Sequence, residues 1–264
     1  MNARDLHARL SRAELDYALF NALRTARDAG RGGIERGAAG MFEYLLDPQR
    51  HTSLYYNRAV CHDPGPLSAD TLAELPDAIA AVELAPVQAT EGLAEALWSR
   101  GFRPAYQLCY LGRAPNADVA AGVAVERVVP GDVDAFFDLL RIEGIDFPPE
   151  KRARKRTYYC TAQFQVFVAR TAEGVPCGWA TMFVGGGTAF FGNSFTAPEH
   201  RHAGVHAALL AARLEAAAAA RIDVAYTDVE HRSQSHHNCE RSGFRVLTIN
   251  TVWGRNPARG ADRG

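Results

Sequence analysis

The sequence predicts an α/β protein with a mixed β-sheet, and three observations lead to this prediction. An apolar, β-prone stretch at 188–197 runs through a short basic turn into an Ala- and Leu-rich segment with high helix propensity. Strand-like and helix-like segments alternate along 123–255. A helix, a Gly-Phe pair and a strand occur twice, at 90–112 and at 233–253, which predicts two related halves.

Residues 1–115 form the first predicted half. Apolar residues recur at helical spacing between positions 10 and 23, and the glycines at 30–33 end that helix. Thr90 is a suitable N-cap for a later helix. The elements expected here, in order, are a helix at 1–30, a strand at 52–60, a helix or turn at 68–75, a strand at 80–84, a helix at 90–100 and a strand at 106–112.

The second predicted half, 123–255, follows a small and polar linker at 116–122. A tail at 256–264 is rich in Gly, Arg and Asp and is expected to be disordered. Besides the stretch at 188–197, the expected strands are 125–129, 164–170, 177–184, 222–229 and 244–253, and the expected helices are 133–143, 150–156, 205–220 and 233–242.

Composition limits the classes of partner. The 264 residues are 47% hydrophobic, enough for one large core or two smaller ones. The formal net charge of -1 creates no strong field toward nucleic acid or an anionic membrane, so neither partner is expected. No apolar run approaches the roughly 20 residues that span a bilayer.

The five cysteines are odd in number and include no CxxC pair. Because the sequence also lacks a recognisable secretory leader, we expect free thiols in a reducing compartment and a cytoplasmic protein. We expect a monomer or a homodimer.

The turn at 199–204 predicts an anion site. The first N–H groups of the helix that follows have no acceptor within the helix, and the helix dipole places partial positive charge at the same end. A phosphate or pyrophosphate group is the expected ligand of such a turn. Taken alone, the turn is equally consistent with an ordinary connection between a strand and a helix.

Three motifs in the second half occur in a fixed order: FTAP at 195–198, RHAGVH at 201–206 and SHHNCERSGF at 235–244. Together they resemble the acetyl-CoA signature, the strand before it and the late helix of the GCN5-related N-acetyltransferase (GNAT) family. The resemblance covers 123–255. It implies the GNAT fold, acetyl-CoA as cosubstrate, transfer of the acetyl group to a primary amine of a small molecule or peptide, and CoA as product.

The first half resembles a degenerate GNAT-like half through LWSRGF at 97–102. The resemblance therefore implies a tandem arrangement in which only the C-terminal half keeps the glycine turn that binds the cofactor.

The resemblance assigns cofactor contacts to the strand edge, the glycine turn and the late helix. These residues are Phe195, Thr196, Arg201, His202, Ala203, Gly204, Val205, His206, Ala207, Ser235 and Asn238. Two positions depart from the family pattern. His206 stands where the family prefers Gly or Ala, and Cys239 stands where it often has Tyr.

Acetyl transfer to an amine requires a proton acceptor for the amine and benefits from a proton donor to the CoA thiolate. Cys239 is the candidate donor at the usual Tyr position, although a buried structural thiol is the simpler interpretation of a lone Cys. Glu143 and Glu230 are the candidate bases, together with Asp146 and Asp228, and a relay through water stays open.

Two further features have competing interpretations. Histidines that suggest a metal site are His200, His202, His206, His231, His236 and His237. Zinc needs three or four converging ligands, and the turn keeps His202 and His206 from sharing a helical face, so no metal is expected. The basic run KRARKR at 151–156 suits nucleic acid or the 3′-phosphate of CoA, or forms a solvated helix face.

Two other functions remain compatible with the motifs. One is a CoA-binding regulatory or interaction module without catalysis, which the missing Tyr favours. The other is transfer of a larger acyl group on the same scaffold.

Overall fold

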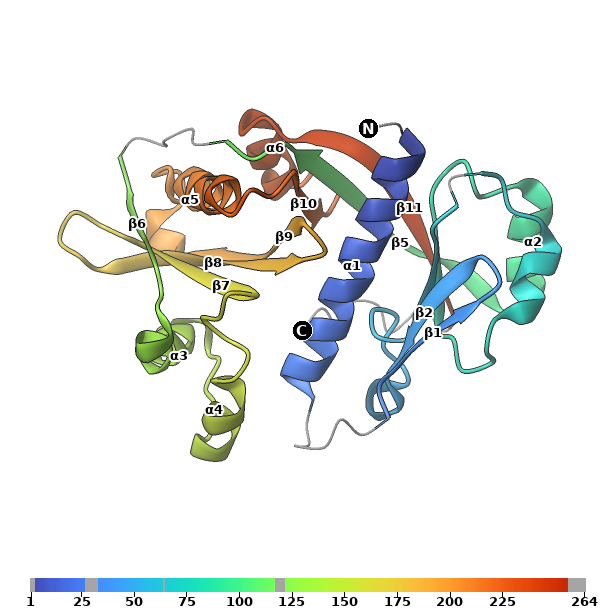
Figure 1. Cartoon of the computed structure of the whole chain (residues 1–264), viewed down its shortest axis with the longest axis horizontal. Helices are drawn as coiled ribbons and strands as arrows, with labels where there is room; N and C mark the ends of the chain where they lie inside the picture. Colours follow the sequence, from blue (N-terminus) through green and yellow to red (C-terminus); the bar gives the residue numbers. More distant parts are fainter. Residues whose placement is uncertain (1–2, 27–32, 64, 117–121, 256–264) are drawn as a thin grey trace. The chain divides into compact units, whose positions relative to one another are not determined.

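The computed structural model describes residues 3–26, 33–63, 65–116 and 122–255, and the chain divides into two compact units (Figure 1). Unit 1 comprises Met1–Tyr110, Val229–His231 and Val246–Gly264, and unit 2 comprises Leu111–Asp228 and Arg232–Arg245. Most of the predicted linker at 116–122 and all of the predicted disordered tail at 256–264 lie outside the described residues.

Unit 1 is a sheet covered by helices. Its strands follow the order β1-β2-β3-β4-β11-β5, in which β3 and β4 are parallel while β1–β2, β2–β3 and β4–β11 are antiparallel. Its elements are α1 (Ala3–Thr25), β1 (Glu35–Ala39), β2 (Phe42–Leu46), the 3₁₀ helix η1 (Pro48–Arg50), β3 (Arg58–Cys61), the 3₁₀ helix η2 (Ala69–Glu74), β4 (Ala81–Leu84), α2 (Glu91–Ser99), β5 (Phe102–Arg113) and β11 (Arg245–Arg255).

One strand prediction in unit 1 needs correction, and one hairpin was missed. The strand predicted at 52–60 begins only at Arg58, because the Asn57 amide donates to the carbonyl oxygens of Arg50 (2.7 Å) and Ser53 (3.1 Å) and holds the preceding residues in turns. The hairpin of β1 and β2 was not predicted. The β1 sequence ERGAA contains no β-branched or aromatic residue, so the sequence carries no strand signal there.

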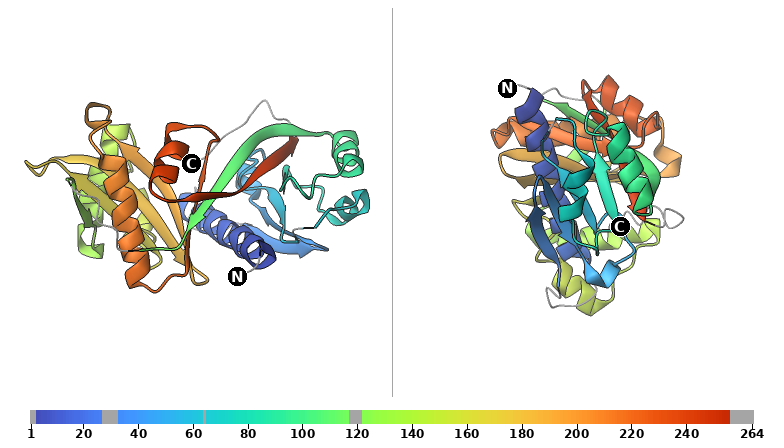
Figure 2. Two further views of the ribbon diagram at one scale, coloured as in Figure 1. Left: turned by 90° about the horizontal axis from the view of Figure 1, so that it is seen from above. Right: turned by 90° about the vertical axis from the view of Figure 1, so that its right-hand side faces the viewer.

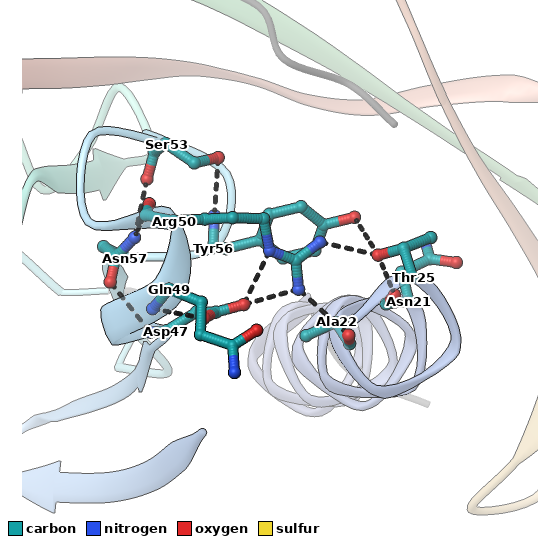
Figure 3. A network of polar contacts seen from close by, with 9 residues as sticks. All are labelled: Asn21, Ala22, Thr25, Asp47, Gln49, Arg50, Ser53, Tyr56 and Asn57. Atoms are coloured by element: carbon teal, nitrogen blue, oxygen red, sulfur yellow. Dashed lines mark hydrogen bonds and ion pairs between the residues drawn. The ribbon is translucent and has the colours of Figure 1, made fainter. Parts of the chain in front are cut away.

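Arg50 holds the last turn of α1 against η1 (Figure 3). Its guanidinium donates to Asp47 Oδ2 (2.6 Å), to Thr25 Oγ1 (2.6 Å) and to the carbonyl oxygen of Ala22 (2.9 Å), and it lies 3.6 Å from the ring centroid of Tyr56. The Ala22 carbonyl belongs to the C-terminal end of α1, where a cation also interacts favourably with the helix dipole.

The C-terminal strand β11 belongs to unit 1 through a buried polar network. Arg58 is fully buried and pairs with Glu14 of α1 and with Glu83 of β4 (2.8 Å), and Asn250 of β11 donates to the other oxygen of Glu83 (2.8 Å). β11 also pairs in register with β4, Trp253 opposite Val82. The last strand, which the sequence grouped with 123–255, therefore makes these contacts in unit 1.

Unit 2 contains the strands in the order β10-β9-β8-β7-β6. β9 and β10 are parallel, and the remaining neighbours are antiparallel. Its elements are β6 (Ala124–Arg127), the 3₁₀ helix η3 (Pro130–Asp132), α3 (Val133–Leu139), the 3₁₀ helix η4 (Leu140–Glu143), α4 (Pro149–Lys155), β7 (Phe164–Arg170), β8 (Pro176–Gly185), β9 (Thr188–Thr196), the 3₁₀ helix η5 (Pro198–His200), α5 (Val205–Ala219), β10 (Val224–Val229) and α6 (Gln234–Arg241).

Helices lie on both faces of the unit 2 sheet. α5 runs along one face (Figure 2), and its first turn approaches β8 so closely that a Cβ at Gly178 would lie 2.7 Å from Val205 Cγ1. Only glycine permits this approach. On the other face, Phe136 of α3 packs edge-on against Trp179, with ring centroids 5.7 Å apart. α5 is thereby held at the end of the sheet where β9 turns into it.

The predicted α/β class with a mixed sheet is confirmed in both units. In the described part of the chain, no helix combines the length and apolar character that a bilayer span requires.

Candidate functional site

β9 and β10 separate partway along their length. They pair only from Thr188 opposite Val224 to Phe191 opposite Thr227. β8 and β9 stay paired as far as Thr196, with a bulge that places one extra β9 residue opposite β8 near Thr181. Beyond Phe191, one edge of β9 is therefore no longer paired with β10, while its other edge still is paired with β8.

The alternation of main-chain groups shows which residues face this open edge. The Ala197 N–H donates to the Cys177 carbonyl oxygen of β8 (3.0 Å). In an antiparallel ladder, the groups of every second residue point to the same neighbour, so Phe195 also directs its main chain to β8. The N–H and C=O groups of Ser194 and Thr196 consequently point to the open edge.

The turn between β9 and α5 supplies a second set of donors. His202 and Gly204 have positive φ angles, of 65° and 80°. The hydrogen bonds of α5 begin with the Ala208 N–H, which donates to the Gly204 carbonyl oxygen (3.0 Å), so the preceding N–H groups, at 205–207, have no acceptor within the helix. A Cβ added to Gly204 would meet no atom within 4 Å, so the space above this glycine is open.

These features meet in a pocket of about 870 Å³ within unit 2. Its walls are the open edge of β9, the turn, the start of α5 and one face of α6. Its lining contains basic side chains and, in this part of the described chain, no acidic one. The lining residues are Ser194, Phe195, Thr196, His200, Arg201, His202, Gly204, Val205, His206, Ala207, Gln234, Ser235, Asn238, Arg241 and Ser242. Together with the helix N-terminus, this lining suits an anionic ligand.

All of the predicted cofactor contacts except Ala203 lie in this lining, and their role as cofactor ligands stays a prediction. Sequence reasoning missed Ser194, His200, Gln234, Arg241 and Ser242. Gln234 and Arg241 are the two missed residues on α6, and their spacing from the predicted Asn238 would have indicated them, because residues separated by three or four positions share a helical face.

Asn238 is held at the centre of the α6 wall. Its Oδ1 accepts hydrogen bonds from Gln234 Nε2 (2.9 Å) and from Arg241 Nη2. The amide oxygen is thus occupied by the protein, and the amide NH₂ is the group that Asn238 offers to a ligand.

His206 is uncharged at neutral pH. Burial, and secondarily the charge of Arg213, lowers the pKa of the His206 imidazole to about 4. Its Nδ1 has no hydrogen-bond partner among the described residues. His206 can therefore offer a ligand a hydrogen bond but no positive charge at this pH.

The candidate catalytic residues occupy different environments. Cys239 is 3% exposed and is not among the residues that line the pocket. Glu143 lies at the end of η4, where burial raises the pKa of its carboxyl. The indole N–H of Trp179 lowers this pKa in part. Trp179 Nε1 has no hydrogen-bond partner among the described residues. Trp179 pairs with Phe195, a lining residue. Glu230 is exposed and belongs to unit 1.

The histidines and the basic run at 151–156 lie in other surroundings than the metal site and the phosphate site, respectively, that the sequence alone would suggest. No group of three His, Cys, Asp or Glu side chains there is arranged to hold a metal ion. In the basic run at 151–156, Arg152 pairs with Asp138 (2.7 Å) and Arg156 with Asp134 (2.5 Å).

No protein-family model and no curated protein matches the sequence. Solved structures do match. A GCN5-related N-acetyltransferase from Kribbella flavida has a TM-score of 0.64 at 19% identity, covering 94% of each chain. A GCN5-related N-acetyltransferase from Sphaerobacter thermophilus has a TM-score of 0.54 at 16% identity, covering 96% of this chain and 93% of its own.

A tandem GNAT protein from the clavulanic acid biosynthesis pathway has a TM-score of 0.51 at 13% identity, covering 80% of this chain and 77% of its own. At these identities the similarity establishes the fold. The chain has the GNAT acyltransferase fold, and the resemblance predicted from its motifs is confirmed at that level.

Proposed function

We propose that the protein is an N-acyltransferase that moves the acetyl group of acetyl-CoA to a primary amine of a small molecule or peptide and releases CoA. The observation that carries the proposal is the pocket in unit 2. It joins a helix N-terminus for an anion to an open strand edge for amides, and its lining has basic side chains without acidic ones.

The two parts of the pocket match the two parts of the donor. The N–H groups at 205–207 and Arg201 bind the pyrophosphate. The main-chain groups of Ser194 and Thr196 pair with the amides of the pantetheine arm, as an added strand would. The Asn238 NH₂ supplies one more donor along the arm.

Transfer then proceeds by direct attack. The amine lone pair forms a bond to the thioester carbonyl carbon, and main-chain N–H groups at the β9 bulge stabilise the oxyanion that develops. The C–S bond breaks, CoA leaves as the thiolate, and the nitrogen gives up its surplus proton.

Glu143 is the proposed acceptor of that proton, because its raised pKa brings the carboxyl closer to the pKa that a base needs at neutral pH. The burial of Cys239 favours a structural thiol over the general acid. CoA leaves as the thiolate without a general acid, because the pKa of an ordinary thiol is only about 8.5.

Calorimetric titration with acetyl-CoA tests the donor site. We expect wild-type binding with one site per chain, and a loss of about 100-fold or more in Gly204→Glu, whose carboxylate would project into the anion site. Gly204→Ala is the matched control, since it carries the same backbone strain of about 1–2 kcal/mol without the charge. Unchanged affinity in Gly204→Glu would remove the basis of the proposal.

A CoA-binding module without catalysis is the second candidate, and the buried Cys239 at the usual Tyr position favours it. Mass spectrometry of a panel of primary amines incubated with acetyl-CoA separates the two. An acetylated product that disappears in Gly204→Glu establishes catalysis, and binding without product from any amine supports the module. The same assay with propionyl-CoA and succinyl-CoA identifies the preferred acyl group.

A further inference from the structure

The pocket contains two arginines on separate walls. Arg201 lies in the turn before α5, next to the helix N-terminus that suits one anionic group. Arg241 lies in the last turn of α6, on the opposite side of Asn238 from Gln234. A single phosphate group at the α5 N-terminus leaves Arg241 without an anionic partner.

Arg241 is available to a ligand. Among the described residues it makes one hydrogen bond, from Nη2 to Asn238 Oδ1, and no ion pair, so its Nε and Nη1 donors have no protein acceptor. The neighbouring acid, Glu240, is outside the pocket lining and lies 3.6 Å from His236 Nε2 and 3.7 Å from His237 Nδ1. The bond to Asn238 orients the guanidinium without neutralising it.

The end of α6 does not repel an anion at this position. Helix C-termini carry partial negative charge on their last carbonyl groups. Here several of these carbonyl oxygens accept hydrogen bonds: the N–H of Gly243 donates to Glu240 (2.9 Å), the N–H of Phe244 donates to Cys239 (3.0 Å), and the guanidinium of Arg113 donates to Ser242. Gly243 has a φ of 79°, as this type of helix ending requires.

We propose that Arg241 forms a second phosphate subsite, which binds the 3′-phosphate of the CoA donor. The proposal rests on the proposed function, because it assigns the pyrophosphate to the turn and α5. Such a subsite makes the enzyme selective for acyl donors with a 3′-phosphorylated ribose. It disfavours 3′-dephospho-CoA and acyl groups carried on phosphopantetheine alone.

The basic run at 151–156 is the competing location, and two of its arginines already have acidic partners. Arg152 and Arg156 pair with acidic residues of α3. Lys155 is buried, with its amine 4.7 Å from the ring centroid of Phe147. None of these residues lines the pocket, whereas Arg241 does.

Calorimetric titration of CoA and 3′-dephospho-CoA into the wild type, Arg241→Gln and Arg201→Gln tests the subsite. We expect the wild type to bind CoA about tenfold more tightly than 3′-dephospho-CoA, as a hydrogen-bonded charge pair would contribute. Arg241→Gln should remove this difference, because it weakens the binding of CoA and leaves that of 3′-dephospho-CoA unchanged. Arg201→Gln should weaken the binding of both ligands and preserve the difference in their affinities. Thermal melting of each variant checks that it is folded.

The outcomes are distinct. Equal wild-type affinity for the two ligands, or equal weakening of both by Arg241→Gln, overturns the subsite and leaves the proposed function intact. Binding of neither ligand to the wild type overturns the proposed function and the subsite with it. A difference that persists in Arg241→Gln but disappears in an Arg152→Gln variant assigns the 3′-phosphate to the basic run instead.

Discussion

Unit 1 and unit 2 both contain a pair of parallel strands that meet briefly and then separate ahead of a short helix. In unit 2, β9 and β10 pair as far as Phe191 and Thr227, and α6 follows β10. In unit 1, β3 and β4 pair as far as Val60 and Glu83, and α2 follows β4. Both helices have side-chain caps, from Ser233 and Thr90, and both end at a glycine with positive φ.

The space beyond the paired strands is filled in unit 1 by a protein side chain. Gln88 is 1% exposed. Its Oε1 accepts from the Ala85 N–H (2.8 Å), and its Nε2 donates to the carbonyl oxygens of Cys61 (3.2 Å) and Asp63 (2.5 Å). The carboxamide thus satisfies main-chain groups of the kind that Ser194 and Thr196 leave exposed to the pocket in unit 2.

The connections between the strands differ as well. β9 and β10 are joined through the glycine turn and the helix α5, whereas β3 and β4 are joined by a loop with only the short 3₁₀ helix η2. A helix N-terminus suitable for pyrophosphate is therefore present in unit 2 and absent from the described part of the unit 1 connection. Under the proposed function, separated strands alone are not sufficient for a donor site, which also requires an unfilled strand edge and a helix N-terminus.

We expect the greatest loss of activity from a change to the proposed base, Glu143 of unit 2. Glu143→Gln should lower kcat for amine acetylation by about 100-fold or more, because it removes the proposed base. Because burial raises the pKa of Glu143, the folded state binds its proton more tightly than the unfolded state does. Its ionised form therefore lowers stability as the pH rises through that pKa, and the variant should melt at a higher temperature at pH 7.

Asp146→Asn is the matched control for Glu143→Gln, since Asp146 is a candidate base from the same segment with an exposed side chain. It should leave kcat within about twofold. Equal losses in the two variants, or full activity in Glu143→Gln, would move the base elsewhere and leave water as the acceptor.

The next largest effect tests the filled edge of unit 1. Gln88→Ala removes the partner of the buried Ala85 N–H and one donor each from the carbonyl oxygens of Cys61 and Asp63, and it should reduce the free energy of unfolding by about 2 kcal/mol, measured by urea denaturation. The exposed Gln107→Ala is the control and should change the free energy of unfolding by less than about 0.5 kcal/mol.

Calorimetry should still find one acetyl-CoA site per chain in Gln88→Ala. A second site would mean that Gln88 blocks a competent donor site.

The turn and the helices of the candidate site could be predicted from the sequence because their signals are local. Gly204, the Ala-rich α5 and the capped α6 are each specified within one or two turns of chain. Spacing groups residues of α6 into faces, and the pocket lining shows that the face with Gln234, Asn238 and Arg241 is the one beside the pocket.

The parts that could not be predicted depend on contacts between distant segments. Gln88 has no local signal, since its partners Cys61 and Asp63 lie more than twenty residues away along the chain. The placement of β11 in unit 1 depends on its pairing with β4 and on the bond from Asn250 to Glu83, 167 residues apart. No periodicity within 244–253 could have indicated either contact.

We expect the weakest effect on acetyl-CoA binding from the side chain of His206, and this prediction asks whether the candidate site in unit 2 needs that side chain. His206→Ala should change the acetyl-CoA dissociation constant by about twofold or less at pH 7.5, because the imidazole is uncharged there and the anion is held by main-chain N–H groups and Arg201.

The stability of the His206→Ala variant should also be less sensitive to acid. With a folded-state pKa of about 4, below the ordinary 6.5, His206 favours unfolding as the pH falls from 6.5 toward 4, and alanine removes that contribution. Urea denaturation at pH 7.5 and pH 5 measures the change, with the exposed His202→Ala as the control. A tenfold loss of affinity in His206→Ala at pH 7.5 would instead make the imidazole a direct ligand of the donor, and the site of unit 2 would then depend on a side chain where the GNAT pattern has only a small residue.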